Sequence, residues 1–165
     1  MAVRPIVKYP DPRLRQVAEP VALFDDALRT LVDDIYDTMR AAPGIGITGP
    51  HLGMLKRIVV IQLAATEPRR AYINPVVVSF SSDTKRHLEG SVSMPGVSDE
   101  IERPASVQVR YQDIDGAEHV EDADGLLAVC LQHEIDQLDG IFWLQRLSPL
   151  RRERVVKRYQ KMQKH

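Results

Sequence analysis

The sequence contains a single cysteine, Cys130, so it cannot form an internal disulfide bond. No run of residues approaches the roughly 20 consecutive apolar residues that a membrane-spanning helix needs. The first residues, MAVRPIV, lack the basic stretch and apolar segment of a secretion signal. These absences exclude a disulfide-stabilised scaffold and a membrane partner, and we expect a cytoplasmic protein.

An excess of one charge is also lacking, because 22 Lys and Arg side chains stand against 23 Asp and Glu, for a net charge of -1. A chain balanced in this way has no general affinity for nucleic acid, so we expect no DNA partner. Its 165 residues, 44% of them hydrophobic, are enough for one globular domain that folds without a metal. No repeat, linker or low-complexity segment divides the chain. We therefore expect a single domain over residues 1–165.

Hydrophobic periodicity predicts three helices. Asp25 is a suitable N-cap for a first helix that runs to Arg40, and a final helix begins near Pro149. A helix between them spans residues 125–138, with Gly140 as its stop signal. The β-rich segments lie at residues 58–61, 73–78, 105–111 and 118–120. The pattern predicts an α+β fold whose middle is mostly antiparallel sheet.

The second helix contains LQHEIDQ at residues 131–137, which is similar to the metal-hydrolase motif H-E-x-x-H. In that motif two histidines lie one helical turn apart and bind a metal, while the glutamate transfers a proton. His133 and Glu134 are present here, but Gln137 occupies the place of the second histidine. Taken alone the match is weak, because a lone His-Glu pair is more often a partly buried histidine beside a solvated acid.

Two further segments make the match specific. Residues 44–51, GIGITGPH, follow the first helix as a glycine-rich loop, and residues 88–93, LEGSVS, lie between strands. With LQHEIDQ, they resemble in order and spacing the three signatures of the peptide deformylase family: G-x-G-x-A-A-x-Q, E-G-C-x-S and Q-H-E-x-D-H. The resemblance continues through YPDPRLR near the start, INP in the middle and LSPL before the last helix, so it covers nearly the whole chain.

The resemblance implies the peptide deformylase fold, in which antiparallel sheets surround a central metal-binding helix between N-terminal and C-terminal helices. It also implies an activity in translation, the removal of the formyl group from N-terminal formyl-methionine. The family uses one divalent metal, Fe2+, Zn2+ or Ni2+, bound by the cysteine of the second signature and both histidines of the third.

In this sequence the three metal-binding positions hold Ser91, His133 and Gln137. A neutral hydroxyl and a carboxamide are poor donors for such a metal. We therefore expect His133 to be the sole retained ligand and the protein to have no metal cofactor. Glu134 occupies the position of the general base, and without a metal-bound water it would be vestigial. The predicted protein is peptide deformylase-like, with hydrolysis lost or strongly impaired.

The substrate-binding positions change less. By resemblance, Ile45, Gly46 and Gly90 lie where the family aligns a peptide as an added strand. The backbone amide of Val92 lies where the family stabilises the tetrahedral oxyanion. His51, by contrast, replaces the family glutamine that helps to hold the formyl oxygen. The sequence therefore predicts that the groove for peptide N-termini is retained although hydrolysis is lost.

One alternative is an active metallo-hydrolase with a rearranged site. His51 should lie close to the old metal site, where it could join His133 and a carboxylate, or act with His133 and Glu134 on a water molecule directly. In the simpler interpretation, His51 only fills space and hydrogen-bonds a neighbour, because new metal sites rarely have suitable geometry by accident.

Two other polar features have structural interpretations. The resemblance implies an ion pair between Glu89 and Arg103 beneath the site, and the alternative is two independent surface charges. Cys130 lies one turn before His133, and in the family pattern it is a small core residue rather than a ligand.

The final helix is basic around an apolar face formed by Val155, Tyr159 and Met162. In the family this segment docks near the ribosomal exit tunnel, so the resemblance implies the ribosome as a partner, beside nascent peptide N-termini. A solvated amphipathic helix that only packs its apolar face is the alternative.

Overall fold

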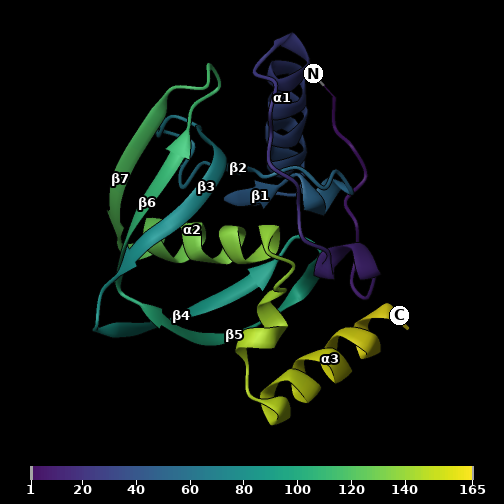
Figure 1. The fold of residues 1–165 in the computed structure, drawn as a ribbon. Coiled ribbons are helices and arrows are strands. Elements are labelled where there is room, and N and C mark those ends of the chain that lie inside the picture. Colours follow the sequence, from purple (N-terminus) through teal and green to yellow (C-terminus); the bar gives the residue numbers. More distant parts are fainter. Residues whose placement is uncertain (1, 165) are drawn as a thin grey trace.

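The computed structural model describes residues 2–164, which form two antiparallel sheets and three α-helices (Figure 1). The helices are α1 (Asp26–Ala41), α2 (Gly125–Leu138) and α3 (Pro149–Gln163). The strands are β1 (Gly46–Thr48), β2 (Ile58–Ile61), β3 (Arg70–Phe80), β4 (Thr84–Ser91), β5 (Met94–Pro104), β6 (Ser106–Gln112) and β7 (Glu118–Asp124). Short 3-10 helices are η1 (Pro12–Arg15), η2 (Pro50–Leu52) and η3 (Trp143–Arg146).

The larger sheet has five strands in the order β1-β2-β3-β6-β7, and the smaller sheet is the β4–β5 hairpin. Helix α2 runs between the two sheets, with α1 beside the β1 end and α3 against β5 (Figure 1). The predicted α+β fold with antiparallel sheets around a central helix is confirmed. Both β1 and β4 have a free edge within the described sheets, which matters for the site below.

Helix α1 begins where the sequence predicts. The Asp25 side chain accepts a hydrogen bond from the backbone N–H of Leu28 over 3.0 Å, as an N-cap should. The apolar stripe of α1 is buried against β2, and its members are Leu28, Val32, Ile35 and Met39. The helix ends at Ala41, just before Pro43 and Gly44.

Helix α2 is buried over most of its surface, which is why it carries both apolar and polar buried side chains. One side packs on the larger sheet through Ala128, Leu131, Ile135 and Leu138. The helix stops before Gly140, which has a φ of 77°, a left-handed conformation that favours glycine. A side chain there would also lie 2.7 Å from the carbonyl oxygen of Arg15, so the predicted stop signal is confirmed.

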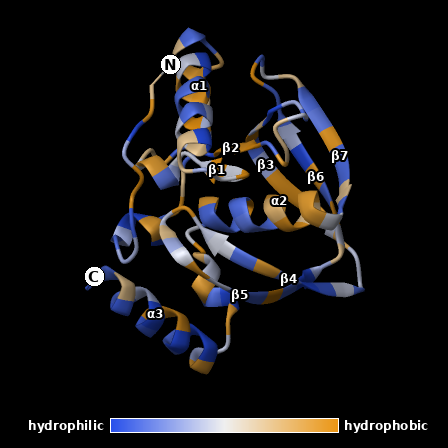
Figure 2. Cartoon of the chain, turned by 180° about the vertical axis from the view of Figure 1, so that it is seen from behind, coloured by the Kyte–Doolittle hydropathy of each residue, from blue (hydrophilic) through white to orange (hydrophobic). Residues whose placement is uncertain are grey.

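Helix α3 packs on β5 through its apolar face and is otherwise mostly hydrophilic (Figure 2). Val155 and Tyr159 are buried as predicted, whereas Met162 is 46% exposed and lies against Gly96. The predicted face is therefore correct for two of its three members.

Of the helices within residues 2–164, none is both long and apolar enough to cross a membrane.

Two predictions about the signature segments were wrong in detail. Residues 88–91 do not lie between strands but form the end of β4, and Val92 and Ser93 make the turn of the hairpin into β5. Residues 44–51 are not only a loop, since they contain β1 and the start of η2. The third β-rich segment begins at Ser106 rather than at residue 105.

Candidate functional site

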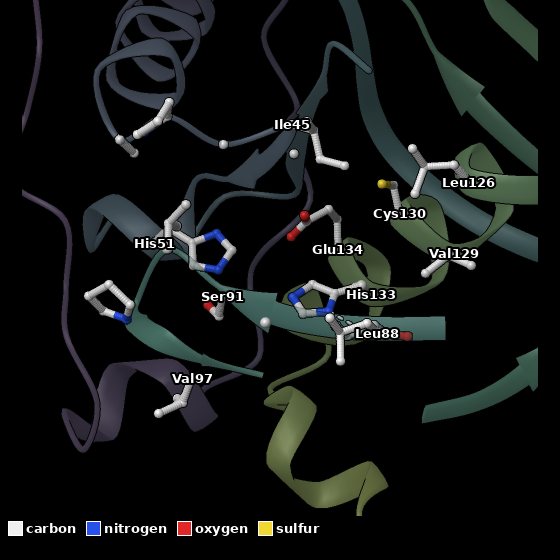
Figure 3. A pocket seen from close by; sticks show the side chains of 18 of the residues that line it. Ile45, His51, Leu88, Ser91, Val97, Leu126, Val129, Cys130, His133 and Glu134 are labelled. Atoms are coloured by element: carbon white, nitrogen blue, oxygen red, sulfur yellow. Dashed lines mark hydrogen bonds and ion pairs between the residues drawn. The ribbon is translucent and has the colours of Figure 1, made fainter. Parts of the chain in front are cut away.

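A cavity of about 440 Å3 opens between α2, β1 and the β4–β5 hairpin (Figure 3). It brings together nearly all of the predicted site residues: Ile45, Gly46, His51, Glu89, Gly90, Ser91, Val92, Cys130, His133 and Glu134. Leu88, Val97, Leu126 and Val129 form the apolar part of its wall, and Val97 and Val129 were not singled out from the sequence. The period-3.6 spacing of Leu126, Val129 and His133 on α2 was the available signal.

Two glycines let the backbone approach the site closely. A side chain at Gly46 would place its Cβ 2.6 Å from Oε2 of Glu134, so the Glu134 carboxylate lies directly against β1. A side chain at Gly90 would lie 2.9 Å from the carbonyl oxygen of Val97. The register between β4 and β5 shifts between Glu89 and Ser91, which is where Gly90 lies.

A chain of ion pairs runs from the cavity to the surface. Nδ1 of His133 lies 2.9 Å from Oε1 of Glu89, and Arg103 donates two hydrogen bonds to the same carboxylate over 2.6 and 2.9 Å. Arg103 also donates to Asp136 over 2.9 Å, and Asp136 accepts two more hydrogen bonds from Arg146. The predicted pair of Glu89 and Arg103 is thus confirmed, and it is part of a longer chain that includes Asp136 and Arg146.

This chain sets the orientation of the His133 ring. Burial alone would raise the pKa of Glu89, but the hydrogen bonds from His133 and Arg103 lower it overall, so Glu89 is an ionised acceptor. Nδ1 of His133 must therefore carry a proton and donate, which leaves Nε2 for the cavity. Burial lowers the pKa of His133, but Glu134 and the bond to Glu89 outweigh it and raise this pKa.

The other two metal-binding positions differ from His133. Gln137 is buried, and its side-chain amide donates a hydrogen bond to the carbonyl oxygen of Leu14 over 2.7 Å. It is not among the residues that line the cavity. Ser91 lines the cavity, and its hydroxyl oxygen accepts a hydrogen bond from the backbone N–H of Ser93 over 3.1 Å.

These residues do not fit the family's metal. Within residues 2–164, no three His, Cys, Asp or Glu side chains are grouped in a way that could hold a metal ion. The set at the three signature positions is one imidazole, one hydroxyl and one amide that is committed to Leu14. Soft and borderline divalent metals need stronger donors than these. The three-ligand cluster with His51 and His133 is not formed in this structure either.

Glu134 is buried beside His133, and its Oε1 atom has no hydrogen-bond partner in the described part of the chain. Burial raises the pKa of Glu134 to about 7, since its carboxylate loses solvation without gaining a donor. Figure 3 shows this carboxylate pointing toward the imidazole of His51 across the cavity. Glu134 is therefore placed as a proton acceptor within the cavity.

His51 is buried at the end of β1, where Thr48 holds it. The backbone N–H of Thr48 donates to Nδ1 of His51 over 3.0 Å, and the Thr48 hydroxyl lies 2.9 Å from the same atom. Burial lowers the pKa of His51 to about 3, so the ring is neutral. Nε2 of His51 has no partner among residues 2–164. His51 lines the same cavity as Ser91 and His133, which occupy two of the three signature positions.

Cys130 reaches the cavity wall but is buried, and burial raises the pKa of its thiol to about 12. A thiol with so high a pKa is a poor nucleophile and a poor ligand at neutral pH. Cys130 thus has the environment of a small core residue.

The arrangement of two antiparallel sheets around a His-Glu helix defines a known class of structure. The peptide deformylase from Legionella pneumophila matches with a TM-score of 0.94 and 38% identity, over 99% of this chain and 96% of that one. The peptide deformylase from Ehrlichia chaffeensis, in complex with actinonin, matches with a TM-score of 0.92 and 37% identity over the whole of both chains.

The family model described as Polypeptide deformylase matches residues 3–153. A relative from Brucella melitensis, named "Peptide deformylase-like", is 65% identical and covers 99% of this chain and 100% of its own. One from Phenylobacterium zucineum, named "Peptide deformylase", is 44% identical and covers 98% and 97%. The chain belongs to the polypeptide deformylase family, whose members generally use a divalent metal.

Proposed function

We propose that this protein is a deformylase-like protein that binds peptide N-termini but has lost, or nearly lost, metal-dependent removal of the formyl group from formyl-methionine. The single observation that carries the proposal is the Gln137 side chain, which is buried and donates to the Leu14 carbonyl over 2.7 Å. A residue held in this way supplies no ligand to the cavity.

The chemistry explains why this loss is severe. Hydrolysis by the family's route needs a metal to lower the pKa of a bound water from 15.7 to about 7. The hydroxyl of Ser91 and the amide of Gln137 cannot replace a thiolate and an imidazole as donors. Without such a water, Glu134 has no acidified proton to accept.

The groove, by contrast, retains the features that a peptide needs. Gly46 belongs to β1 and Gly90 to β4, and each of these strands has a free edge in its sheet. An extended peptide can therefore pair with the backbone as an added strand. The cavity rim is apolar, since Ile45 is 40%, Leu88 69% and Leu126 47% exposed. Such a rim suits a peptide whose N-terminal residue has an apolar side chain.

Metal content and turnover test the proposal together. The protein, purified and then incubated with Fe2+ under anaerobic conditions or with Zn2+, is assayed for bound metal by mass spectrometry and for deformylation of a formyl-Met tripeptide. We expect well below one equivalent of metal and negligible turnover. About one equivalent, with turnover on the order of 1 per second or more, would overturn the proposal.

A restoring variant provides the matched control. The double variant Ser91→Cys with Gln137→His should bind about one equivalent of metal. It supplies a thiolate on the β4–β5 hairpin and a second imidazole on α2. Adding His133→Ala to this pair should abolish the binding again, which places the metal at the signature positions. If the restored pair bound no metal, the change would extend beyond the ligands, with His51 the first residue to test.

A second candidate function is an active hydrolase that uses His51, His133 and Glu134 directly on water. The observation that favours it is a pair of buried atoms on the same cavity, Nε2 of His51 and Oε1 of Glu134, that have no hydrogen-bond partner among residues 2–164. This candidate predicts that His51→Ala abolishes any residual hydrolysis or metal uptake. If His51→Ala matched the natural protein in both hydrolysis and metal uptake, this candidate function would be eliminated.

We also propose that α3 contacts the ribosome, which would place the protein in the cytoplasm. Burial of Val155 and Tyr159 leaves the basic side chains of α3 on its outer side, among them Lys157 and Arg158. Such contacts to phosphates would weaken steeply with salt. Co-sedimentation with ribosomes at 50 and 200 mM salt tests this, and equal sedimentation after Lys157→Gln with Arg158→Gln would contradict it.

A further inference from the structure

Three separate segments form the walls of the cavity: residues 44–51, the β4–β5 hairpin and α2 (Figure 3). Within residues 2–164, no hydrogen bond joins residues 44–51 directly to residues 88–93. A peptide that pairs with both of these segments must lie about 4.8 Å from each edge, so their separation has to be fixed. Hydrogen bonds between the two segments do not fix it.

The N-terminal segment, residues 7–18, supplies a link between these two walls. The backbone N–H of Val7 donates to the carbonyl oxygen of His51 over 2.8 Å. The backbone N–H of Tyr9 donates to the carbonyl oxygen of Ser93, also over 2.8 Å. Because Val7 and Tyr9 are two positions apart, this short stretch bridges the first two signature segments.

The same N-terminal segment is bonded to α2, the third wall. The side-chain amide of Gln137 donates to the carbonyl oxygen of Leu14 over 2.7 Å, and the backbone N–H of Ala18 donates to that of Leu138 over 2.8 Å. Leu14 lies in η1 and is 1% exposed, so this end of the N-terminal segment is anchored in the core. At a position where the resemblance implies a metal ligand, α2 is thus linked to the start of its own chain.

Packing holds the N-terminal segment in place between these bonds. The ring of Tyr9 stacks on Phe142 with the centroids 5.9 Å apart, and it meets the edge of Tyr159 at 6.1 Å. Val7 and Leu14 are buried in the same apolar cluster as these rings. In Figure 1 the purple N-terminal trace runs down from beside α1 to η1. We therefore expect a displacement at η1 to move the bridge between the other two walls.

We propose that the N-terminal segment holds the three walls at the separation that a bound peptide requires, and that Gln137 is the positioning residue that fixes it to α2. This inference rests on the proposed function, because it requires a groove that binds peptides. It gives Gln137 a role in binding although its side chain does not line the cavity. Loss of its bond to Leu14 should therefore weaken peptide binding as well as stability.

The first test compares two substitutions of the same kind on α2. Gln137→Leu removes the donor to Leu14. Gln132→Leu removes another buried amide, which donates to the carbonyl oxygens of Pro104 and Ala128 over 3.0 Å each. Gln132 does not line the cavity, and its bonds reach β5 and α2 rather than the N-terminal segment. It is therefore the matched control for the loss of a buried amide as such.

Fluorescence anisotropy measures the binding of formyl-Met-Ala-Ser and of free Met-Ala-Ser, each with the same C-terminal fluorophore. Gln137→Leu should weaken the better-bound peptide at least about tenfold, a common size of coupling between linked sites, and Gln132→Leu by less than about threefold. Thermal unfolding verifies that both variants are folded at the assay temperature. Equal effects of the two substitutions, or unchanged binding by Gln137→Leu, would overturn the inference.

Hydrogen exchange on the natural protein provides a second test, which needs no variant. Coupling is reciprocal, so a peptide that requires the N-terminal segment in place must stabilise that segment when it binds. Saturating peptide should slow exchange of the Val7 and Tyr9 N–H groups at least about fivefold by NMR. The N–H of Asp113, bonded to the Ala117 carbonyl in the β6–β7 turn, is the control and should not change. Unchanged exchange at Val7 and Tyr9 would overturn the inference, even if Gln137→Leu does not fold.

The two proposals fail in different ways. If the natural protein binds neither peptide at concentrations up to about 1 mM, the proposed function fails and this inference fails with it. If the natural protein binds a peptide, but the variants at Gln137 and Gln132 bind it equally well, only this inference fails.

Discussion

The side-chain amide of Gln137 is bonded to the carbonyl oxygen of Leu14 over 2.7 Å, so the last position of the helix signature is tied to η1 near the start of the chain. The bond joins residues 123 positions apart in the sequence. Gln137 thus has a structural role between two buried segments, at a position where the resemblance to the family implies a metal ligand.

Gln137→Leu should lower the free energy of unfolding by about 2 kcal/mol, because it leaves the buried carbonyl of Leu14 without a donor. Urea denaturation followed by circular dichroism measures this. The same substitution at the exposed Gln160 of α3 is the control, and it should change stability by less than about 0.5 kcal/mol. Equal effects at both positions would show that the bond to Leu14 contributes nothing.

Gly46→Ala should displace the Glu134 carboxylate, because the new Cβ would lie 2.6 Å from Oε2. We expect a loss of about 1–3 kcal/mol of stability, the usual cost of overpacking. Combining it with Glu134→Asp, which shortens the side chain, should cost clearly less than the sum of the two single variants. If urea denaturation showed that the double variant loses the full sum of the two single losses in unfolding free energy, the contact between Gly46 and Glu134 would be contradicted.

Arg103→Met should be among the most damaging substitutions, because it leaves the buried carboxylate of Glu89 without its ion-pair partner. Breaking a buried pair from one side costs about 3–5 kcal/mol. Arg86→Met is the matched control, since Arg86 pairs with Glu102 on the exposed face of the same hairpin and should cost at most about 1 kcal/mol. Similar unfolding midpoints for the two variants would show that the buried pair of Glu89 and Arg103 stabilises the protein no more than the exposed pair does.

Asp34 provides a prediction of pH dependence. Its carboxylate accepts hydrogen bonds from Arg4 over 2.6 and 2.9 Å, and these lower its pKa from 3.8 to about 2. A depressed pKa in the folded state stabilises the protein above pH 3.8, and this contribution is lost as the pH falls through about 2. Asp34→Asn should therefore cost roughly 2 kcal/mol at pH 7 and much less at pH 2. Thermal melts at both values measure the difference, and a gap that stayed constant would contradict it.

Much of the fold could be predicted because local signals agree with the final structure. Asp25 caps α1, and Gly140 follows α2, where the chain adopts a left-handed conformation. The β4–β5 hairpin was harder to predict. Its strands carry many charged side chains, such as Arg86 and Glu102, so they lack the apolar alternation by which a strand is recognised.

The site could be predicted by position but not by conformation. Most of its signature residues line one cavity, but Gln137 does not. The sequence could not tell that Gln137 turns to Leu14, because the side-chain rotamer depends on which acceptors the folded core offers. Nor could it tell that Asp136 and Arg146 continue the ion pair of Glu89 and Arg103, since they meet only in the tertiary structure.

The bond from Thr48 to His51 has a consequence for how the site tolerates mutation. The donor that fixes the proton on Nε2 of His51 is a main-chain N–H, which every amino acid except proline possesses. Position 48 can therefore change its side chain through many mutations while the imidazole keeps the same tautomer. The tautomer of His51 is thus set by the backbone at position 48. Most substitutions of the Thr48 side chain should leave that tautomer unchanged.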